Sequence, residues 1–201
     1  MFTGLVSDVG HVKSVEDRNG LRRVRVEGVY PASAIQMGAS IQHSGVCLTV
    51  VEFGERAGGS WWVVEAIPET LARTTLGRWQ AGSRVNLELS LKLGDELGGH
   101  LVYGHVDGLG ELSQIRQVGE SRVLRVSVPK DLSKFFAEKG SVTIDGVSLT
   151  VSAVGDAWFE VSLIPHTLSV TTLGGLSQGD KVNLEVDMLA RYVARMLEWR
   201  A

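Results

Sequence analysis

The sequence has a single cysteine, little excess charge and no long hydrophobic run. One cysteine, Cys47, excludes a disulfide within the chain and a cysteine-rich zinc site. The formal net charge is only −3, so we expect no basic surface for nucleic acid. No apolar run approaches the ~20 residues that a transmembrane helix requires, and Met1 to Gly4 do not begin a signal peptide. We therefore expect a soluble, cytoplasmic protein without a nucleic-acid or membrane partner.

What the sequence does contain is an internal repeat. Four blocks recur in the same order at an offset of about 100 residues, which chance does not produce in one chain. The paired segments are 40–50 and 141–151, 67–77 and 164–174, 85–89 and 182–186, and, more faintly, 2–6 and 102–106. The sequence therefore predicts two copies of one domain, over residues 1–92 and 93–186, and a C-terminal segment over residues 187–201.

Each copy has the pattern of an all-β domain. Short β-branched runs alternate with turn formers such as Asn19-Gly20. About six strands per copy, in repeats too long for a propeller blade, favour a small closed barrel over a sandwich. The predicted fold is all-β: a tandem pair of six-stranded β-barrels followed by a C-terminal α-helix.

Three segments are expected to be helical. Pro31–Met37 and Pro129–Ala137 occupy equivalent places in the two copies, with proline in the first turn of a short helix. The C-terminal segment Asp187–Arg200 has apolar residues at positions 188/189, 192/193 and 196/197, which form a helical stripe, and Asp187 is the predicted N-cap. Two closed barrels offer this stripe no obvious partner. An oligomerisation helix is the favoured interpretation, and a helix packed on its own barrel is the alternative.

The repeated strand Gly-Val-(Cys/Ser)-Leu-Thr-Val places polar groups on one face. Strand periodicity sets Cys47 and Thr49 opposite the aliphatic residues of the first copy, and it does the same for Ser148 and Thr150 in the second. The aliphatic residues must face the core, so the thiol and hydroxyls point to a surface, a cleft or a partner. Solvated strand residues are the simpler interpretation of one such strand. The same parity in both copies favours a site.

The joint between the copies, residues 93–108, is rich in glycine and contains two histidines. A metal site is rejected, because His100 and His105 would lie on opposite faces of an extended segment and no metal-ligand spacing is present. Closely spaced glycines allow backbone to approach backbone or a flat ligand. A structural role is the usual one for either histidine alone, but their place at the joint makes at least one of them a site candidate.

Several familiar catalytic motifs are absent from the sequence. It contains no Gly-x-Ser-x-Gly elbow, no phosphate loop and no dinucleotide fingerprint. Glu69 is a lone carboxylate whose repeat equivalent is His166, so a paired-carboxylate mechanism has no support.

Together, these motifs resemble the riboflavin synthase family, alpha-chain type, over essentially the whole chain. The resemblance rests on Met1–Val6, the two Gly-Val-(Cys/Ser)-Leu-Thr-Val strands, the joint Gly-Gly-His-Leu-Val-Tyr-Gly-His-Val-Asp-Gly and the paired Ile-Pro-x-Thr-Leu segments. It implies Greek-key barrels that bind lumazine, and a dismutation of two molecules of 6,7-dimethyl-8-ribityllumazine into riboflavin and 5-amino-6-(ribitylamino)uracil. No cofactor or metal is implied.

The resemblance also implies an assembly. The family is homotrimeric through its C-terminal helices, and two lumazines meet between the N-terminal barrel of one subunit and the C-terminal barrel of its neighbour. A reaction that consumes two copies of one substrate suits a chain with two copies of one binding unit. Association with a lumazine synthase capsid is left open.

The resemblance implies one group of site residues for each barrel. The N-terminal group is Gly4, Leu5, Val6, Ser40, Cys47, Leu48, Thr49, Glu65, Ala66, Ile67, Pro68, Glu69 and Thr70. The C-terminal group is Gly104, His105, Val106, Ser148, Leu149, Thr150, Leu163, Ile164, Pro165, His166, Thr167 and Leu168, with Lys139 reaching across from another subunit. Main-chain groups at strand edges suit the donors and acceptors of a pteridine ring, and hydroxyls and a carboxylate would hold the ribityl chain.

Catalytic roles also follow from the resemblance. The donor's C7 methyl group must lose a proton, and a nucleophile must add to C7 of the acceptor. His105 and Ser148 resemble the acid–base and nucleophile-activating pair, with Asp145 supporting Ser148. Cys47 and Ser40 would act on the substrate of the N-terminal barrel. Holding two rings face to face would supply most of the rate.

Two positions differ from the family pattern: Ser44 stands where many members have asparagine, and His166 where they have glutamate. The main alternative is a non-catalytic lumazine- or flavin-binding accessory protein, like the lumazine proteins of luminous bacteria. Cys47, His105 and Ser148 are all present, which favours the enzyme. A flavin-dependent reductase would need a nicotinamide-binding domain, for which the two repeats leave no residues.

Overall fold

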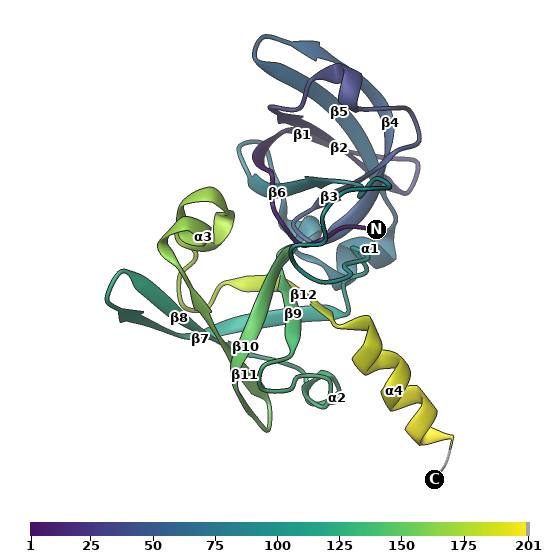
Figure 1. The fold of residues 1–201 in the computed structure, drawn as a ribbon. Helices are drawn as coiled ribbons and strands as arrows, with labels where there is room; N and C mark the ends of the chain where they lie inside the picture. The colour runs from purple at the N-terminus through teal and green to yellow at the C-terminus, as the bar shows by residue number, and fades with distance from the viewer. Residues whose placement is uncertain (200–201) are drawn as a thin grey trace.

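The computed structural model describes residues 1–199, which form two closed β-barrels and a C-terminal helix (Figure 1). This confirms the predicted pair of six-stranded barrels. Residues 200 and 201, the end of the predicted C-terminal segment, lie outside the described residues.

The first barrel is antiparallel and closes in the strand order β1-β2-β5-β4-β3-β6. Its strands are β1 (Asp8–Arg18), β2 (Leu21–Gly28), β3 (Ser40–His43), β4 (Val46–Arg56), β5 (Gly59–Ala66) and β6 (Arg84–Leu89). Strands β3, β4 and β5 are joined as consecutive hairpins, and β2 lies beside β5 instead of β3. These four strands therefore form a Greek key. The 3-10 helix η1 (Ala32–Ala34), helix α1 (Pro68–Arg73) and the 3-10 helix η2 (Thr75–Arg78) lie in the connections.

The second barrel repeats this topology with the order β10-β11-β8-β7-β12-β9. Its strands are β7 (Gly108–Val118), β8 (Ser121–Ser127), β9 (Ser141–Ile144), β10 (Val147–Gly155), β11 (Trp158–Leu163) and β12 (Lys181–Val186). Its connections contain α2 (Lys130–Ser133), α3 (Pro165–Val170) and the 3-10 helix η3 (Thr172–Gly175). Each barrel encloses its own core, and the two cores share no buried residue.

The two short helices predicted after proline are shorter than expected. Pro31 and Pro129 are N-cap residues, and only Ala32–Ala34 and Lys130–Ser133 are helical. The chain then turns into extended backbone or loop to reach β3 and β9. Helices α1 and α3, which begin at Pro68 and Pro165 in the repeated Ile-Pro-x-Thr-Leu segment, were not predicted from the sequence.

The two barrels dock through a reciprocal exchange of asparagine side chains. Asn86 on β6 donates from Nδ2 to Asp145 O at 2.8 Å, and Asn183 on β12 donates to Ser44 O at 2.7 Å. The Oδ1 atom of each asparagine accepts a main-chain N–H from a 3-10 helix of the other barrel, at 2.8 Å from Thr172 and 2.7 Å from Thr75. Both amides are buried, so these bonds satisfy polar groups that water cannot reach.

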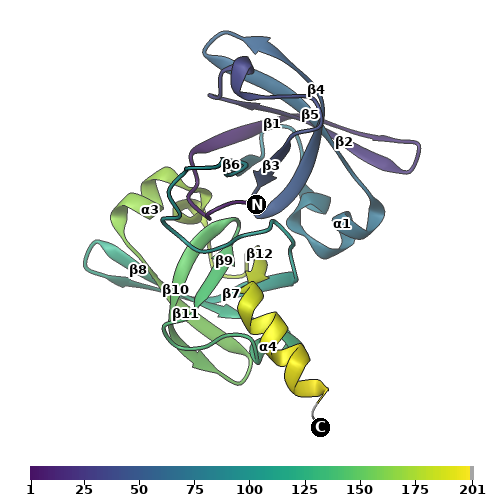
Figure 2. The same ribbon diagram turned by 45° about the vertical axis from the view of Figure 1, so that its right-hand side comes forward.

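The C-terminal helix α4 (Met188–Glu198) extends away from the barrels (Figures 1 and 2). Asp187 caps it, accepting the N–H of Leu189 at 2.9 Å, as predicted. Two ion pairs connect α4 to residues of the second repeat: Arg191–Asp107 at 2.7 Å and Lys134–Glu198 at 3.3 Å.

The apolar stripe of α4 is open. Its members are more than half exposed: Leu189, Tyr192, Val193, Met196 and Leu197. The alternative of a helix packed through this stripe on its own barrel is therefore wrong. No helix within residues 1–199 has the length and apolar character needed to cross a membrane.

Candidate active site

In each barrel, one pair of neighbouring strands separates at one end. The ladder between β4 and β5 ends at Val50–Val64, and the equivalent ladder between β10 and β11 ends at Val151–Val161. A register shift lies next to each end, as at a β-bulge. Beyond it the facing strand edges carry main-chain N–H and C=O groups that do not pair with each other. Such groups are ready to bind a flat ligand with alternating donors and acceptors.

A segment preceding the first strand of the other repeat enters each opening. We call these two segments, residues 3–6 and 103–106, the crossing segments. Gly104 O accepts the N–H of Cys47 on β4 at 2.9 Å, and Gly4 O accepts the N–H of Ser148 on β10 at 2.8 Å. Val106 packs against the first core, whereas Val6 packs against the second. Each opening is therefore built from both halves of the chain.

Glycine is required at both crossing points. Gly4 and Gly104 have φ of +77° and +74°, and an added Cβ would lie 2.5 Å from Ser148 Cβ and 2.6 Å from Cys47 Cβ. The backbone thus approaches β4 and β10 too closely for any side chain.

Two buried carboxylates hold the crossing segments. Glu88 on β6 accepts bonds from Thr3 N at 2.7 Å and Gly4 N at 3.0 Å, and Glu185 on β12 accepts bonds from Tyr103 N at 2.7 Å and His105 N at 2.8 Å. Burial raises the pKa of both carboxyl groups, and the accepted hydrogen bonds act in the opposite direction. Neither carboxylate was among the predicted site residues, although both lie in the repeated Val-Asn-Leu-Glu block.

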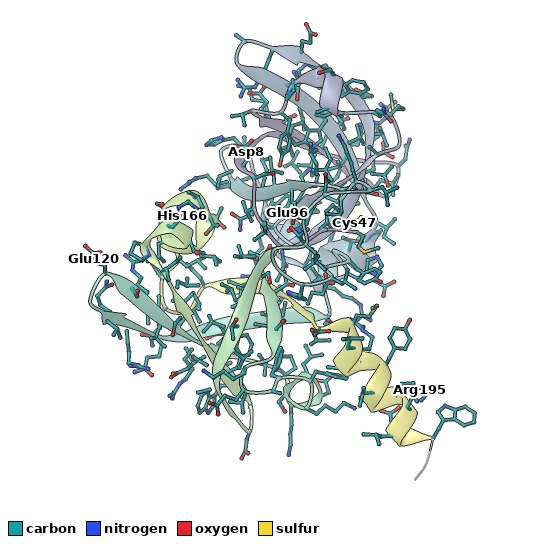
Figure 3. The ribbon with its side chains drawn as sticks, in the orientation of Figure 1. Asp8, Cys47, Glu96, Glu120, His166 and Arg195 are labelled. Atoms are coloured by element: carbon teal, nitrogen blue, oxygen red, sulfur yellow. The ribbon has the colours of Figure 1, made fainter. Side chains whose placement is uncertain are left out.

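The opening in the first barrel is a cleft of about 270 Å³. Its lining residues are Val46, Cys47, Ile67, Glu69, Thr70, Arg73, Thr74, Gly104, His105 and Val106. Figure 3 shows Cys47 at this end of the first barrel, close to α1. The cleft brings a thiol, an imidazole and a carboxylate to one surface.

In the second barrel, Ser148 contacts a histidine. His100 Nδ1 lies 2.7 Å from Ser148 Oγ, and His100 Nε2 lies 3.2 Å from Thr143 Oγ1. Thr143 and Ser148 are direct cross-strand partners on β9 and β10, so one imidazole spans both hydroxyls.

Comparisons with known proteins agree with this repeated architecture. The model of the Lumazine binding domain family matches residues 3–90 and 103–187. Riboflavin synthase from Brucella abortus (strain 2308) is 48% identical over 201 residues, the full length of both chains. The chain belongs to the riboflavin synthase family. Riboflavin synthase from Bacillus subtilis (strain 168) is 34% identical and covers 98% of this chain and 90% of its own.

A solved structure of the same fold is LumP complexed with riboflavin. It is 26% identical to this chain, with a TM-score of 0.79 over 92% of this chain and 99% of the LumP chain. LumP binds riboflavin in that structure, and the same protein was also solved with 6,7-dimethyl-8-(1'-D-ribityl) lumazine.

The crossing corrects how the family's site residues divide between the barrels. Gly104, His105 and Val106 were predicted for the C-terminal site, but they lie at the first barrel beside Cys47. Gly4 and its neighbours were predicted for the N-terminal site, but they lie at the second barrel. The resemblance, carried over by position, assigned each segment to the barrel that follows it in the chain.

Within this chain, the two residues predicted to act with Ser148 lie elsewhere, and a pairing of His105 with Ser148 of another subunit stays a prediction. The Ser148 side chain contacts His100, and His105 instead lines the first cleft. Asp145 lies in the turn between β9 and β10, where its Oδ1 accepts the N–H of Asn183 at 2.8 Å. Burial raises the pKa of Asp145 to about 7. Asp145 thus stabilises the contacts between strands and between barrels, and its carboxylate does not support Ser148.

Ser40 lies outside the cleft that contains Cys47. It faces Thr49 across the β3–β4 ladder and lines a separate cleft of about 220 Å³ with residues of η1 and of the segment after β6. Thr49 and Thr150 are exposed, and Leu48 is buried, so the predicted strand parity is confirmed.

The remaining candidates differ in what they offer a ligand. Ala66 and Leu163 belong to the cores, so only their main chains are available. Ile67 and Ile164 are exposed at the starts of α1 and α3. Lys139 is exposed in the turn before β9.

The structure also separates the two joint histidines. The segment 101–106 is not a regular strand, and only Val102 forms a β-bridge, with Phe2. His100 and His105 nevertheless go to different barrels. Within residues 1–199, no group of three His, Cys, Asp or Glu side chains is arranged to hold a metal ion.

Replacing Gly104 with alanine tests the crossing. Gly20→Ala is the matched control, because Gly20 has φ of +77° and nothing lies within 4 Å of its added Cβ. We expect Gly20→Ala to lower the free energy of unfolding by about 1 kcal/mol through its backbone conformation alone. Gly104→Ala must also displace Cys47, so we expect a loss of about 3 kcal/mol or more in urea titrations. Equal losses in the two variants would show that no close crossing exists.

Proposed function

We propose that this protein converts two molecules of 6,7-dimethyl-8-ribityllumazine into riboflavin and 5-amino-6-(ribitylamino)uracil by transferring a four-carbon unit, without a cofactor or metal. The observation that carries this proposal is that two equivalent strand pairs in one chain, β4–β5 and β10–β11, separate at one end. We call these the splayed strand pairs. Family membership and the lumazine bound in a LumP structure support it. This activity makes the protein a transferase.

Each splayed pair fits one lumazine ring. The unpaired main-chain groups beside Cys47 and Ser148 supply donors and acceptors for the ring edge. Polar side chains at the starts of α1 and α3, including Glu69 and His166, would hold the ribityl chain. The change from Glu69 to His166 between the repeats gives the two ribityl sites different contacts.

The two ligands cannot react within one chain. Helix α1 borders the first site, α3 occupies the equivalent place in the second barrel, and the two helices lie on opposite sides of the barrel pair (Figures 1 and 2). Transfer between lumazines therefore requires the first site of one chain to face the second site of another. The open stripe of α4 offers the contact, and we propose a homotrimer built around it.

This assembly defines the work of the side chains. His105 and Cys47 would act from the first site, and Ser148 would act from the second site of the neighbouring copy. The imidazole of His105 suits proton transfer near neutral pH. Holding the rings together removes the cost of a bimolecular encounter, which accounts for most of the rate. The protein acts where riboflavin is made in the cell, which we propose is the cytoplasm.

Turnover of purified protein tests the proposed activity. Anaerobic incubation with 6,7-dimethyl-8-ribityllumazine should yield one riboflavin for every two lumazines consumed, with no added cofactor. We expect His105→Gln to lower kcat about tenfold or more. His11→Gln, at an exposed position on β1, is the control with unchanged kcat. Tight binding without turnover would contradict the enzyme and leave a lumazine-binding accessory protein.

Sedimentation tests the assembly. The wild-type chain should sediment as a trimer, whereas Val193→Glu with Met196→Glu should give monomers, because buried charge opposes packing of the stripe. Activity should fall with the loss of trimer, since the two half-sites then separate. Arg195→Gln, on the same helix, is the control that remains trimeric. A fully active wild-type monomer would refute the shared site.

A further inference from the structure

The two half-sites differ at one cross-strand pair. In the second barrel this pair is Thr143–Ser148, spanned by His100. In the first barrel it is Gln42–Cys47, and the Gln42 amide binds Glu88 at 3.0 Å and the N–H of Gly45 at 3.2 Å. The first pair thus has a structural amide where the second has a hydroxyl aimed at an imidazole.

We propose that His100 is a positioning residue that orients Ser148 and accepts its hydroxyl proton, so that Ser148 Oγ takes the C7 methyl proton of the lumazine bound at the second barrel. This inference rests on the proposed function for the identity of the ligand. It makes the second barrel the site of the donor.

The geometry selects one hydrogen-bonding arrangement for this role. A neutral imidazole has one N–H donor and one acceptor nitrogen. When Nε2–H donates to Thr143 Oγ1, Nδ1 is free to accept the Ser148 hydroxyl at 2.7 Å. The lone pairs of Oγ are then available to the ligand. A nucleophile or base, an imidazole and a third group that orients the imidazole form the arrangement typical of activated serines.

The surroundings hold the ring in place. The main-chain N–H of His100 donates to the carbonyl oxygen of Thr3, on the crossing segment, at 3.2 Å. An added Cβ at the preceding Gly99 would lie 2.1 Å from Thr3 O and 3.0 Å from Ser148 Oγ, so the backbone is tightly packed there.

The charge state of His100 also suits a proton acceptor. Burial lowers the pKa of His100, and the carboxylate of Asp187 at the start of α4 acts in the opposite direction. The neutral form therefore predominates at pH 7, as acceptance of a proton requires.

The proton transfer balances without another reactant. The C–H bond of the C7 methyl breaks, its proton goes to Ser148 Oγ, and the hydroxyl proton of Ser148 moves to Nδ1 of His100. The lumazine becomes an anion and His100 an imidazolium. Return of the proton by the same route regenerates both groups, so exchange with solvent can be observed without net reaction.

The test uses NMR to follow exchange of the C7 methyl protons of lumazine in deuterium oxide. The measured quantity is the exchange rate with protein minus the rate of free lumazine. We expect the wild-type protein to accelerate exchange, with the rate falling as pH drops and His100 becomes protonated. His100→Asn should lower the excess rate about tenfold or more and remove this acidic limb, while the lumazine Kd changes less than about twofold. Asparagine keeps a polar atom near Ser148 but cannot accept a proton at this pH.

A second pair of variants guards against misfolding of His100→Asn. Thr143 is buried, and valine is nearly isosteric with threonine, so Thr143→Val removes the orienting hydroxyl with little change of shape. We expect it to lower the exchange rate less than His100→Asn does. Thr143→Ser restores a hydroxyl and should recover most of that loss. If the hydroxyl had only a structural role, Thr143→Val would raise the lumazine Kd and lower the exchange rate in parallel.

The exchange assay separates this inference from the proposed function. Exchange that depends on His100 in a protein that makes no riboflavin would support the inference and refute the proposed activity. Riboflavin formation with wild-type exchange in both His100→Asn and Thr143→Val would overturn the inference alone. A wild-type protein that does not accelerate exchange also overturns it.

Discussion

The structure depends on one exchanged contact, in which the backbone of each repeat closes the opening of the other. The carbonyl of Gly104 binds β4 at Cys47, and the carbonyl of Gly4 binds β10 at Ser148. Neither barrel therefore completes its own site. The buried carboxylates that anchor the crossing segments and the glycines that permit their approach follow from this requirement.

The repeat makes two similar openings between strands, and the side chains at the two openings differ. The first places Cys47 beside His105 in an open cleft, whereas the second places Ser148 against His100. Under the proposed function, two copies of one ligand would meet unlike side chains. A dismutation needs this, because one molecule must give up what the other accepts. In the proposed trimer, the exposed stripe of α4 would bring these unlike sites together.

The sequence predicts the fold better than it predicts the site. Internal repetition, alternating strands and the Asp187 cap each depend on local pattern, and the structure confirms the barrels, the strand parity and the helix. Partners across the site depend on which way a loop crosses, and no local pattern records that. The family resemblance placed Gly104 with the C-terminal barrel, whereas the fold sets it beside Cys47. It paired Ser148 with His105, which stays a prediction for the assembly, and within one chain Ser148 contacts His100. The resemblance assigned Asp145 to Ser148, whereas the hairpin turn directs its side chain toward Asn183.

The central claim is that each chain holds one lumazine in each splayed strand pair. The most direct measurement is equilibrium dialysis with a ribityllumazine that lacks the C7 methyl group and therefore cannot react. The account predicts two ligands bound per chain. One ligand per chain at saturation would contradict it, because one of the two openings would then have no role in binding.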